Sequence, residues 1–396
     1  MSFHGQITVL LCFFFGQGKP LSFFITIYIV FVIDENKILK VTIIKYIICP
    51  TNEFYYDMKR KILFIYYQNI KAGGIAKVLA NLANELIKEA YQVEILFLMR
   101  EHEDFYPLDS RIKKHYVDSF SFWTFRLCQF NRKYLRFIPR LDNINTYIYQ
   151  LGVTILMNNW LKQNHMKYDL IISCWYKLSC TLALNKKVSH KTIAWEHASH
   201  KVGGVFWNKL KVYYENLQNI ICLNHDDYLY YKGINPQTSV IGNMMDSPIE
   251  DQYFIPKENK ENLITMIARL EQEKNVLEFL EIIKESELPV DWQIKIIGDG
   301  SQMPILKEYI ENNSLSNVFL LGQLDPGNVR SILSRSKISC LTSLTEAFGV
   351  VLIEAMFSSN ALITYNCPGG PSEIVNKQNG FLISAGDKED FKDKLK

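Results

Sequence analysis

Two glutamates and the residues between them are the group in this sequence whose chemistry is easiest to interpret. Seven residues separate Glu346 from Glu354, and the apolar run from Val350 to Met356 predicts a helix of about two turns. At about 1.5 Å per residue, the two carboxylates would lie roughly 12 Å apart. That separation is too long for an acid and a base that act on one bond. It suits an extended ligand with hydroxyl groups at both ends.

The backbone between the two glutamates favours an anion. The amides of Phe348, Gly349 and Val350 lie at the expected helix start, where N–H groups lack helical partners and the helix dipole is positive. Hydroxyl groups at both ends with negative charge between them describe a sugar nucleotide. Two glutamates at this spacing also occur by chance, on a helix with a solvated acidic end, so the pair alone leaves both interpretations open.

The elements around the glutamates make the pattern more specific. Ile338–Leu341 predicts a buried strand, Thr342–Phe348 a loop, and Ala361–Thr364 a second strand that leads into the tight loop Cys367–Ser372. This arrangement resembles the E-x7-E region of retaining glycosyltransferases of family 4, and the resemblance extends over residues 58–396. It implies an α/β protein with the GT-B fold, in which two doubly wound Rossmann-like domains face a cleft.

The same resemblance implies a role for each residue of the donor side. Glu346 would hold hydroxyl groups of the donor sugar and orient its anomeric carbon, and Glu354 would hold the ribose. Arg269 and Lys274 would contact the donor phosphates, although the mixed charge of their segment by itself predicts an ordinary surface loop. Gly298, in a turn after a strand, would let the nucleotide approach closely. The implied reaction transfers a hexose or N-acetylhexosamine from a UDP-sugar to a glycan with retention, without a metal or other cofactor.

The first half of the chain predicts a second α/β domain. Lys61–Tyr67 and Val93–Leu98 read as buried strands, and Ile75–Ala90 between them as an amphipathic helix. Gly73 and Gly74 stand before this helix, where glycine lets the backbone come close to a ligand. A simple tight turn explains the two glycines at least as well. In the resembled family this loop faces the cleft on the acceptor side.

His197 is the second candidate for a catalytic role. It ends the triplet Trp195-Glu196-His197 after the expected strand Lys191–Ala194, and open α/β sheets place ligand contacts at strand ends. A lone histidine is more often structural. The triplet resembles a branch of family 4 that extends polyprenyl-diphosphate-linked or capsular and exopolysaccharide glycans in bacteria. This implies that His197 contacts the donor sugar, and that the enzyme works in the cytoplasm or on the inner face of the cell membrane.

Residues 119–164 interleave aromatic and basic side chains. Two interpretations are equally favoured: a helix in a membrane interface, or a helical hairpin that covers the sheet. The residues concerned are Phe120, Phe122, Trp123, Phe125, Phe130, Tyr134, Phe137 and Tyr147, with Arg126, Arg132, Lys133, Arg136 and Arg140.

The ends of the chain differ from the resembled pattern. Residues 1–57 hold two apolar runs, each shorter than a membrane span. They fit a membrane-surface anchor, an extra apolar subdomain or, as we favour, translation from an upstream start codon. Residues 58–242 would form the acceptor-side domain and residues 243–396 the donor-side domain. The chain stops within an expected helix at Asp387–Lys396, and the family pattern predicts that it is truncated.

Composition excludes several other classes of protein. The 396 residues are enough for two domains, and a net charge of +3 does not indicate a nucleic-acid partner. The eight cysteines form no C-x-x-C pair and read as small buried hydrophobes. Adjacent His225, Asp226 and Asp227 predict a helix cap and a solvated face rather than a metal site. Two alternatives stay open: an epimerase or phosphorylase on the same fold, or a truncated binder of sugar nucleotides.

Overall fold

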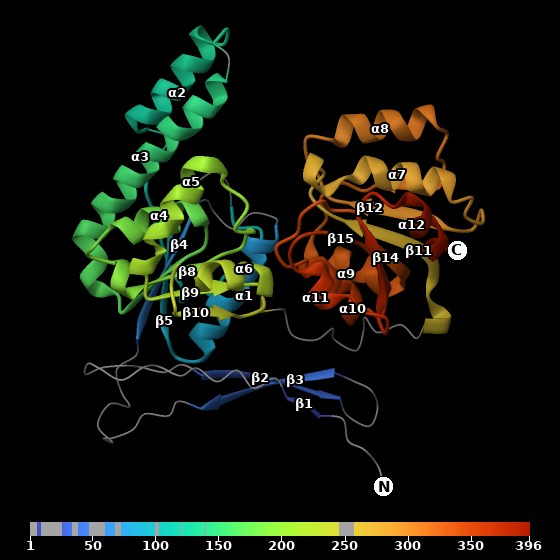
Figure 1. The fold of residues 1–396 in the computed structure, drawn as a ribbon, viewed down its shortest axis with the longest axis horizontal. Coiled ribbons are helices and arrows are strands. Elements are labelled where there is room, and N and C mark those ends of the chain that lie inside the picture. The colour runs from blue at the N-terminus through green and yellow to red at the C-terminus, as the bar shows by residue number, and fades with distance from the viewer. Residues whose placement is uncertain are drawn as a thin grey trace. The chain divides into compact units, whose positions relative to one another are not determined.

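The computed structural model of the chain describes residues 60–67, 73–99, 103–119, 121–138, 140–244 and 257–396, together with the backbone of three earlier strands (Figure 1). Those strands belong to a separate compact unit, Met1–Lys59. They are β1 (Gln6–Thr8), β2 (Thr26–Ile33) and β3 (Leu39–Tyr46), and they form an antiparallel sheet in the order β1-β2-β3. Most of residues 1–57 lies outside the described residues, so the three interpretations of that segment stay predictions.

The second unit, Arg60–Lys396, contains two parallel sheets. The first has seven strands in the order β10-β9-β8-β7-β4-β5-β6, and every described pair is parallel. Its strands are β4 (Lys61–Tyr66), β5 (Gln92–Phe97), β6 (Lys113–Tyr116), β7 (Leu170–Ser173), β8 (Thr192–Trp195), β9 (Asn219–Cys222) and β10 (Thr238–Val240).

Helices cover both faces of this sheet, which is why its central strands are apolar on both sides. Helix α1 (Gly74–Lys88) packs Val78 and Leu79 into one core with Phe64. On the other face, the second half of α3 (Leu141–Asn164) packs Val153, Met157 and Leu161 against Leu63 and Ile65. The remaining helices of this half are α4 (Tyr176–Leu184), α5 (Gly204–Leu210) and α6 (His225–Lys232), with a 3-10 helix at Lys211–Asn216.

Residues 119–164 form a helical hairpin, which confirms the hairpin prediction only in part. Helix α2 (Trp123–Tyr134) packs on α3, and Asn131 donates a buried 2.8 Å hydrogen bond to Asn145. Only the second half of α3 covers the sheet, and the rest of the hairpin extends away from it (Figure 1). Among the described helices, none combines the length and hydropathy of a membrane span.

The second sheet has six strands in the order β13-β12-β11-β14-β15-β16, again all parallel. Its strands are β11 (Glu261–Ile267), β12 (Gln293–Ile297), β13 (Val318–Leu320), β14 (Ser336–Leu341), β15 (Ala361–Asn366) and β16 (Gly380–Ser384). Its helices are α7 (Val276–Glu285), α8 (Met303–Asn312), α9 (Pro326–Arg335), α10 (Val350–Phe357), α11 (Pro371–Ile374) and α12 (Lys388–Leu395).

Counted within each sheet, both strand orders contain the series 3-2-1-4-5-6 of a doubly wound fold. The predicted pair of parallel α/β domains is therefore confirmed. The predicted boundary between them, at residues 242 and 243, is followed by residues 245–256, which lie outside the described residues. The doubly wound order also fixes where each sheet places its ligand contacts, namely beyond the strand ends where the order reverses.

Candidate active site

The predicted donor-side residues follow two neighbouring strands at such a reversal point. Strands β11 and β14 pair in parallel in the middle of the second sheet. Arg269 and Lys274 come after β11, and Glu346 comes after β14. Because parallel strands end at the same edge, residues about 75 positions apart in the chain are brought to one side of the sheet.

The loop of Glu346 is held in place by the Pro/Gly loop that follows β15. The amide of Glu346 donates to the carbonyl of Pro368 at 3.2 Å, and the amide of Gly370 donates to the carbonyl of Glu346 at 3.0 Å. Gly369 has a φ of 113°, and a Cβ at this residue would lie 1.6 Å from the Glu346 carbonyl oxygen. Only glycine fits there. The Pro/Gly loop therefore positions the loop of Glu346.

Lys274 is the predicted cation that the structure brings to Glu346. Its Nζ contacts Glu346 Oε2, and the two side chains are only 13% and 19% exposed. Arg269 behaves differently, because its side chain is 62% exposed and its guanidinium pairs with Glu273 at 2.8 Å. Arg269 thus matches the alternative interpretation of a mixed-charge surface loop, and its contact with a phosphate stays a prediction.

Helix α10 begins one residue after Gly349, which takes the left-handed conformation with φ 85°. Glu346 therefore lies in the loop before the helix. The estimate of 12 Å between the carboxylates assumed one continuous helix and does not apply. In the described part of the chain, the amides of Phe348, Gly349 and Val350 have no hydrogen-bond acceptor. Amides without acceptors at a helix start suit an anion, and their contact with the donor stays a prediction.

Glu354 contacts a residue that the sequence did not single out. Lys77 Nζ, from α1 of the first half, forms an ion pair with Glu354 Oε1. Only its position in the sequence could have indicated Lys77, because it stands three residues after Gly74, in the first turn of the helix that follows the two glycines. Both glutamates of the pair therefore face a lysine, Glu346 within its own half and Glu354 across to the other.

The two acceptor-side glycines begin helix α1, since Gly73 is its capping residue and Gly74 its first residue. A Cβ at Gly74 would be 4.0 Å from Val350 Cγ2, and Phe348 and Val350 pack against the core around α1. Gly298 has a structural explanation of its own, because a Cβ there would lie 1.8 Å from the Ala268 carbonyl oxygen. The approach of a nucleotide to Gly298 stays a prediction.

His197 lies just past β8 and is 8% exposed. Within the described residues, its Nε2 is buried without a hydrogen-bond partner. Burial lowers the pKa of His197 to about 3, so the ring is neutral at physiological pH. No described contact joins His197 to either glutamate. A buried ring nitrogen without a partner is rare in native proteins, and the contact of His197 with a donor sugar stays a prediction.

This buried ring predicts a specific pH dependence of stability. The unfolded chain binds a proton at His197 below about pH 6.5, whereas the folded chain binds it only near pH 3, so stability falls as pH decreases between these values. His197→Gln removes the titrating group. Between pH 7 and pH 5 the variant is expected to gain about 2 kcal/mol relative to the parent in urea unfolding. A constant difference between the two proteins over this range would contradict the assignment.

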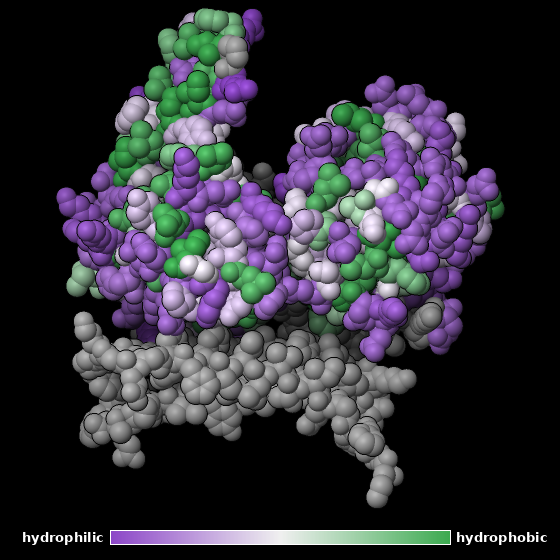
Figure 2. Space-filling model, viewed as in Figure 1, coloured by the Kyte–Doolittle hydropathy of each residue, from purple (hydrophilic) through white to green (hydrophobic). Residues whose placement is uncertain are grey.

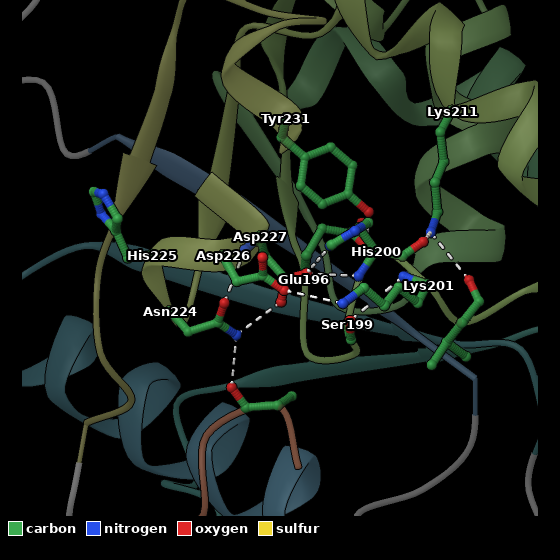
Figure 3. Close-up of polar contacts among 12 residues, drawn as sticks. Glu196, Ser199, His200, Lys201, Lys211, Asn224, His225, Asp226, Asp227 and Tyr231 are labelled. Carbon is green, nitrogen blue, oxygen red and sulfur yellow. Dashed lines mark hydrogen bonds and ion pairs between the residues drawn. The ribbon is translucent and has the colours of Figure 1, made fainter. Parts of the chain in front are cut away.

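The neighbour of His197 in the triplet is structural. Glu196 is fully buried and accepts hydrogen bonds from the hydroxyls of Tyr214 at 2.9 Å and Tyr231 at 3.3 Å. Desolvation raises the pKa of Glu196. Lys211 holds the next part of the loop by donating to the carbonyls of His200 and Val202 (Figure 3).

The prediction for His225, Asp226 and Asp227 was wrong in two respects. Helix α6 does begin at His225, but its capping residue is Asn224, whose Oδ1 accepts from the amide of Asp227 at 2.8 Å. Asp227 is 3% exposed rather than solvated. It accepts hydrogen bonds from the amide of His200 at 2.6 Å and from His200 Nδ1 at 2.7 Å. The first turn of α6 faces the His197 loop, so Asp227, the third residue of this helix, points toward that loop.

The described cysteines confirm the prediction made for them. Cys128, Cys174, Cys180, Cys222, Cys340 and Cys367 are buried and free. Within the described residues, no three His, Cys, Asp or Glu side chains are grouped to hold a metal ion. Metal independence of the reaction stays a prediction.

Residues 249–396 match the family model described as glycosyl transferases group 1. Two curated relatives align with most of the chain. One is the GalNAc-alpha-(1->4)-GalNAc-alpha-(1->3)-diNAcBac-PP-undecaprenol alpha-1,4-N-acetyl-D-galactosaminyltransferase of Campylobacter jejuni, 26% identical over 83% of this chain and 86% of the relative. The other is the amylovoran biosynthesis glycosyltransferase AmsD of Erwinia amylovora, 25% identical over 81% of this chain and 84% of the relative.

Solved structures agree with the fold. The lipopolysaccharide outer core galactosyltransferase WaaB in its apo form matches with a TM-score of 0.58 and 20% identity, over 85% of this chain and 89% of that one. HepE of Anabaena in complex with UDP matches with a TM-score of 0.60 and 18% identity, over 85% and 88%. The predicted GT-B fold is confirmed.

Proposed function

We propose that this chain is a glycosyltransferase that moves a hexose or N-acetylhexosamine from a UDP-sugar to a glycan acceptor with retention. The observation that carries the proposal is the Glu346 loop. A carboxylate paired with Lys274, three amides without acceptors and a second carboxylate follow each other there within nine residues. The match of residues 249–396 to a glycosyltransferase family model supports the same reaction class.

The charges around this loop suit the departure of a nucleotide diphosphate. As the bond between the sugar and the diphosphate breaks, negative charge grows on the leaving oxygen. The ammonium of Lys274 and the amides of Phe348, Gly349 and Val350 would stabilise that charge without a metal ion. Such fixed cations and dipoles need no reorganisation during the step, which is why they stabilise a transition state more than a ground state.

The carboxylates would orient the two sugars of the donor. In the proposal, Glu354 accepts hydrogen bonds from the ribose hydroxyls, and Glu346 accepts them from the donor sugar. A bound phosphate would replace Glu346 as the partner of Lys274, and sugar hydroxyls would replace Lys274 as the partners of Glu346. Neither charged group would then be left without a partner. The neutral ring of His197 would contact the donor sugar through its unpartnered Nε2.

We further propose that the hairpin of α2 and α3 contacts the membrane that carries the acceptor, on the cytoplasmic face. Its exposed side chains include Trp123, Phe130 and Phe137, the last 76% exposed, and Asp142 is the only acidic residue between positions 121 and 164. Figure 2 shows hydrophobic and hydrophilic residues side by side over this hairpin. Exposed aromatic and basic residues together suit an anionic lipid surface.

An apolar groove continues this exposed face toward the sheet. It has a volume of about 570 Å³ and lies between α3, α4 and α5. Its lining includes Tyr147, Leu151, Leu184, Phe206 and Trp207. The Campylobacter relative is named for a PP-undecaprenol substrate. A glycan linked to polyprenyl diphosphate is therefore the acceptor class that we propose.

The proposal is tested by donor binding and transfer with the full chain. Nucleotide sugars are first screened by thermal shift, because a ligand that binds the folded state raises the unfolding temperature. Transfer to a polyprenyl-diphosphate-linked glycan in vesicles is then measured in EDTA. We expect stabilisation by a UDP-sugar and transfer that persists in EDTA.

Each other outcome has a defined meaning. Turnover of the donor without an acceptor would favour an epimerase, and turnover with phosphate a phosphorylase. Stabilisation by UDP without turnover would identify a binder. Transfer that disappears in EDTA and returns with a divalent ion would contradict the metal-free account.

A further inference from the structure

The side chain of Asn224 joins the two halves of the second unit. It lies between β9 and α6, is 1% exposed, and belongs to the first sheet's half. Its Nδ2 donates to the carbonyl of Ala347 at 2.9 Å, a residue 123 positions later in the chain (Figure 3). Ala347 stands between Glu346 and Phe348. The hydrogen bond therefore ends on the loop that carries the first glutamate.

The same amide continues to the His197 loop. Asn224 Nδ2 also donates to Asp227 Oδ2 at 2.7 Å, and Asp227 Oδ1 accepts both from the amide of His200 and from its ring. Both polar groups of the Asn224 side chain are thus used: Nδ2 donates two hydrogen bonds, and Oδ1 accepts one. A buried amide with a full set of partners has one orientation, and losing a partner is costly.

Further contacts show that this is where the halves touch. The amide of His225, next to Asn224, donates to Glu373 Oε1 at 2.6 Å. A Cβ at Gly242 would be 3.3 Å from the ring of Phe348. On its other side, the Glu346 loop is held by Pro368 and Gly370 of its own half. Asn224 contacts the Glu346 loop from the opposite half, through its hydrogen bond to the carbonyl of Ala347.

We propose that Asn224 is a positioning residue of the candidate active site. With Asp227 it forms a relay, His200–Asp227–Asn224–Ala347, that fixes the Glu346 loop relative to the His197 loop. The inference rests on the proposed function only in assigning a ligand to the Glu346 loop. Because the relay connects the two loops, we expect a ligand that orders one of them to order the other as well, and this coupling is reciprocal.

The variants separate this role from the capping of α6. Asn224→Ser keeps a good N-cap but is too short to reach Ala347, so the helix stays capped and the relay is broken. Asp325→Ala is the matched control, because Asp325 caps α9 by accepting from the amides of Gly327 and Asn328. It removes a cap and leaves the relay intact.

Hydrogen–deuterium exchange of the full chain, with and without UDP, tests the relay. Without UDP, we expect Asn224→Ser to exchange at least about fivefold faster than the parent over residues 342–349, and Asp325→Ala to match the parent there. With UDP, the parent is expected to be protected over both 342–349 and 196–203, and Asn224→Ser over 342–349 alone. Transfer by Asn224→Ser, measured well below its unfolding transition, should fall about tenfold; the unfolding temperature itself should also fall, because Ala347 and Asp227 each lose a buried donor.

Two results would overturn the relay. One is equal exchange over 342–349 in Asn224→Ser and the parent. The other is protection of 196–203 by UDP that survives the substitution. If the parent itself shows no response to UDP, the proposed function fails, whereas the comparison without UDP still decides whether Asn224 holds the loop.

Discussion

Replacing Glu346 by glutamine is expected to lower the rate of transfer at saturating donor by about 10² to 10³-fold, the range found when one preorganised electrostatic contact is removed. The amide keeps the size of the side chain but carries no charge. It can no longer form an ion pair with Lys274 Nζ, and it accepts sugar hydroxyls more weakly than a carboxylate does. The side chain is neither in the hydrophobic core nor part of a helix, so the fold should be retained.

The control for this variant is a second lysine-paired glutamate of the same half. Glu281 pairs with Lys388 between α7 and α12, and Glu281→Gln breaks a Lys–Glu pair without touching the Glu346 loop. Initial rates and circular dichroism are measured for both variants. Full turnover by Glu346→Gln with the natural acceptor would remove Glu346 from the mechanism. Equal losses in the two variants would trace the effect to stability.

Neutralising the hairpin is expected to abolish binding to anionic vesicles. The variant replaces Arg126, Lys133, Arg136 and Arg140 by glutamine, all of them exposed. Each cation near an anionic membrane contributes about 1 kcal/mol. Losing four should weaken partitioning by at least about 10²-fold. Sedimentation of the full chain with phosphatidylglycerol vesicles measures the change, and raised salt should weaken binding of the parent in the same direction.

A matched set of surface lysines provides the control for charge alone. Lys284, Lys307, Lys377 and Lys396 are exposed in the other half, and their replacement by glutamine should leave vesicle binding within about twofold. Replacing Trp123, Phe130 and Phe137 by serine should weaken the binding that persists at high salt, because that part depends on apolar area. If the variant without the four hairpin cations binds vesicles as well as the parent does, the hairpin is not the membrane contact.

The sequence by itself determined the elements and the position of the donor-side motif. The predicted helix Ile75–Ala90 and strand Val93–Leu98 lie within two residues of α1 and β5 at each end, because local apolar periodicity follows from the burial of each element. The polar edge strand β6 was missed for the same reason, since an edge strand need not be apolar. The spacing of Glu346 and Glu354 was visible because nine consecutive residues contain both of them.

Only the tertiary structure decided which side chains face that motif. Lys77 meets Glu354 across 277 positions and Asn224 meets Ala347 across 123, and neither residue differs in its local sequence from an ordinary helix or loop position. The sequence predicts that Asp227 is solvated, whereas the packing of α6 against the His197 loop buries it. The packing of the two halves places these residues side by side. Contacts between segments so far apart in the chain depend on the packing of whole elements rather than on local periodicity.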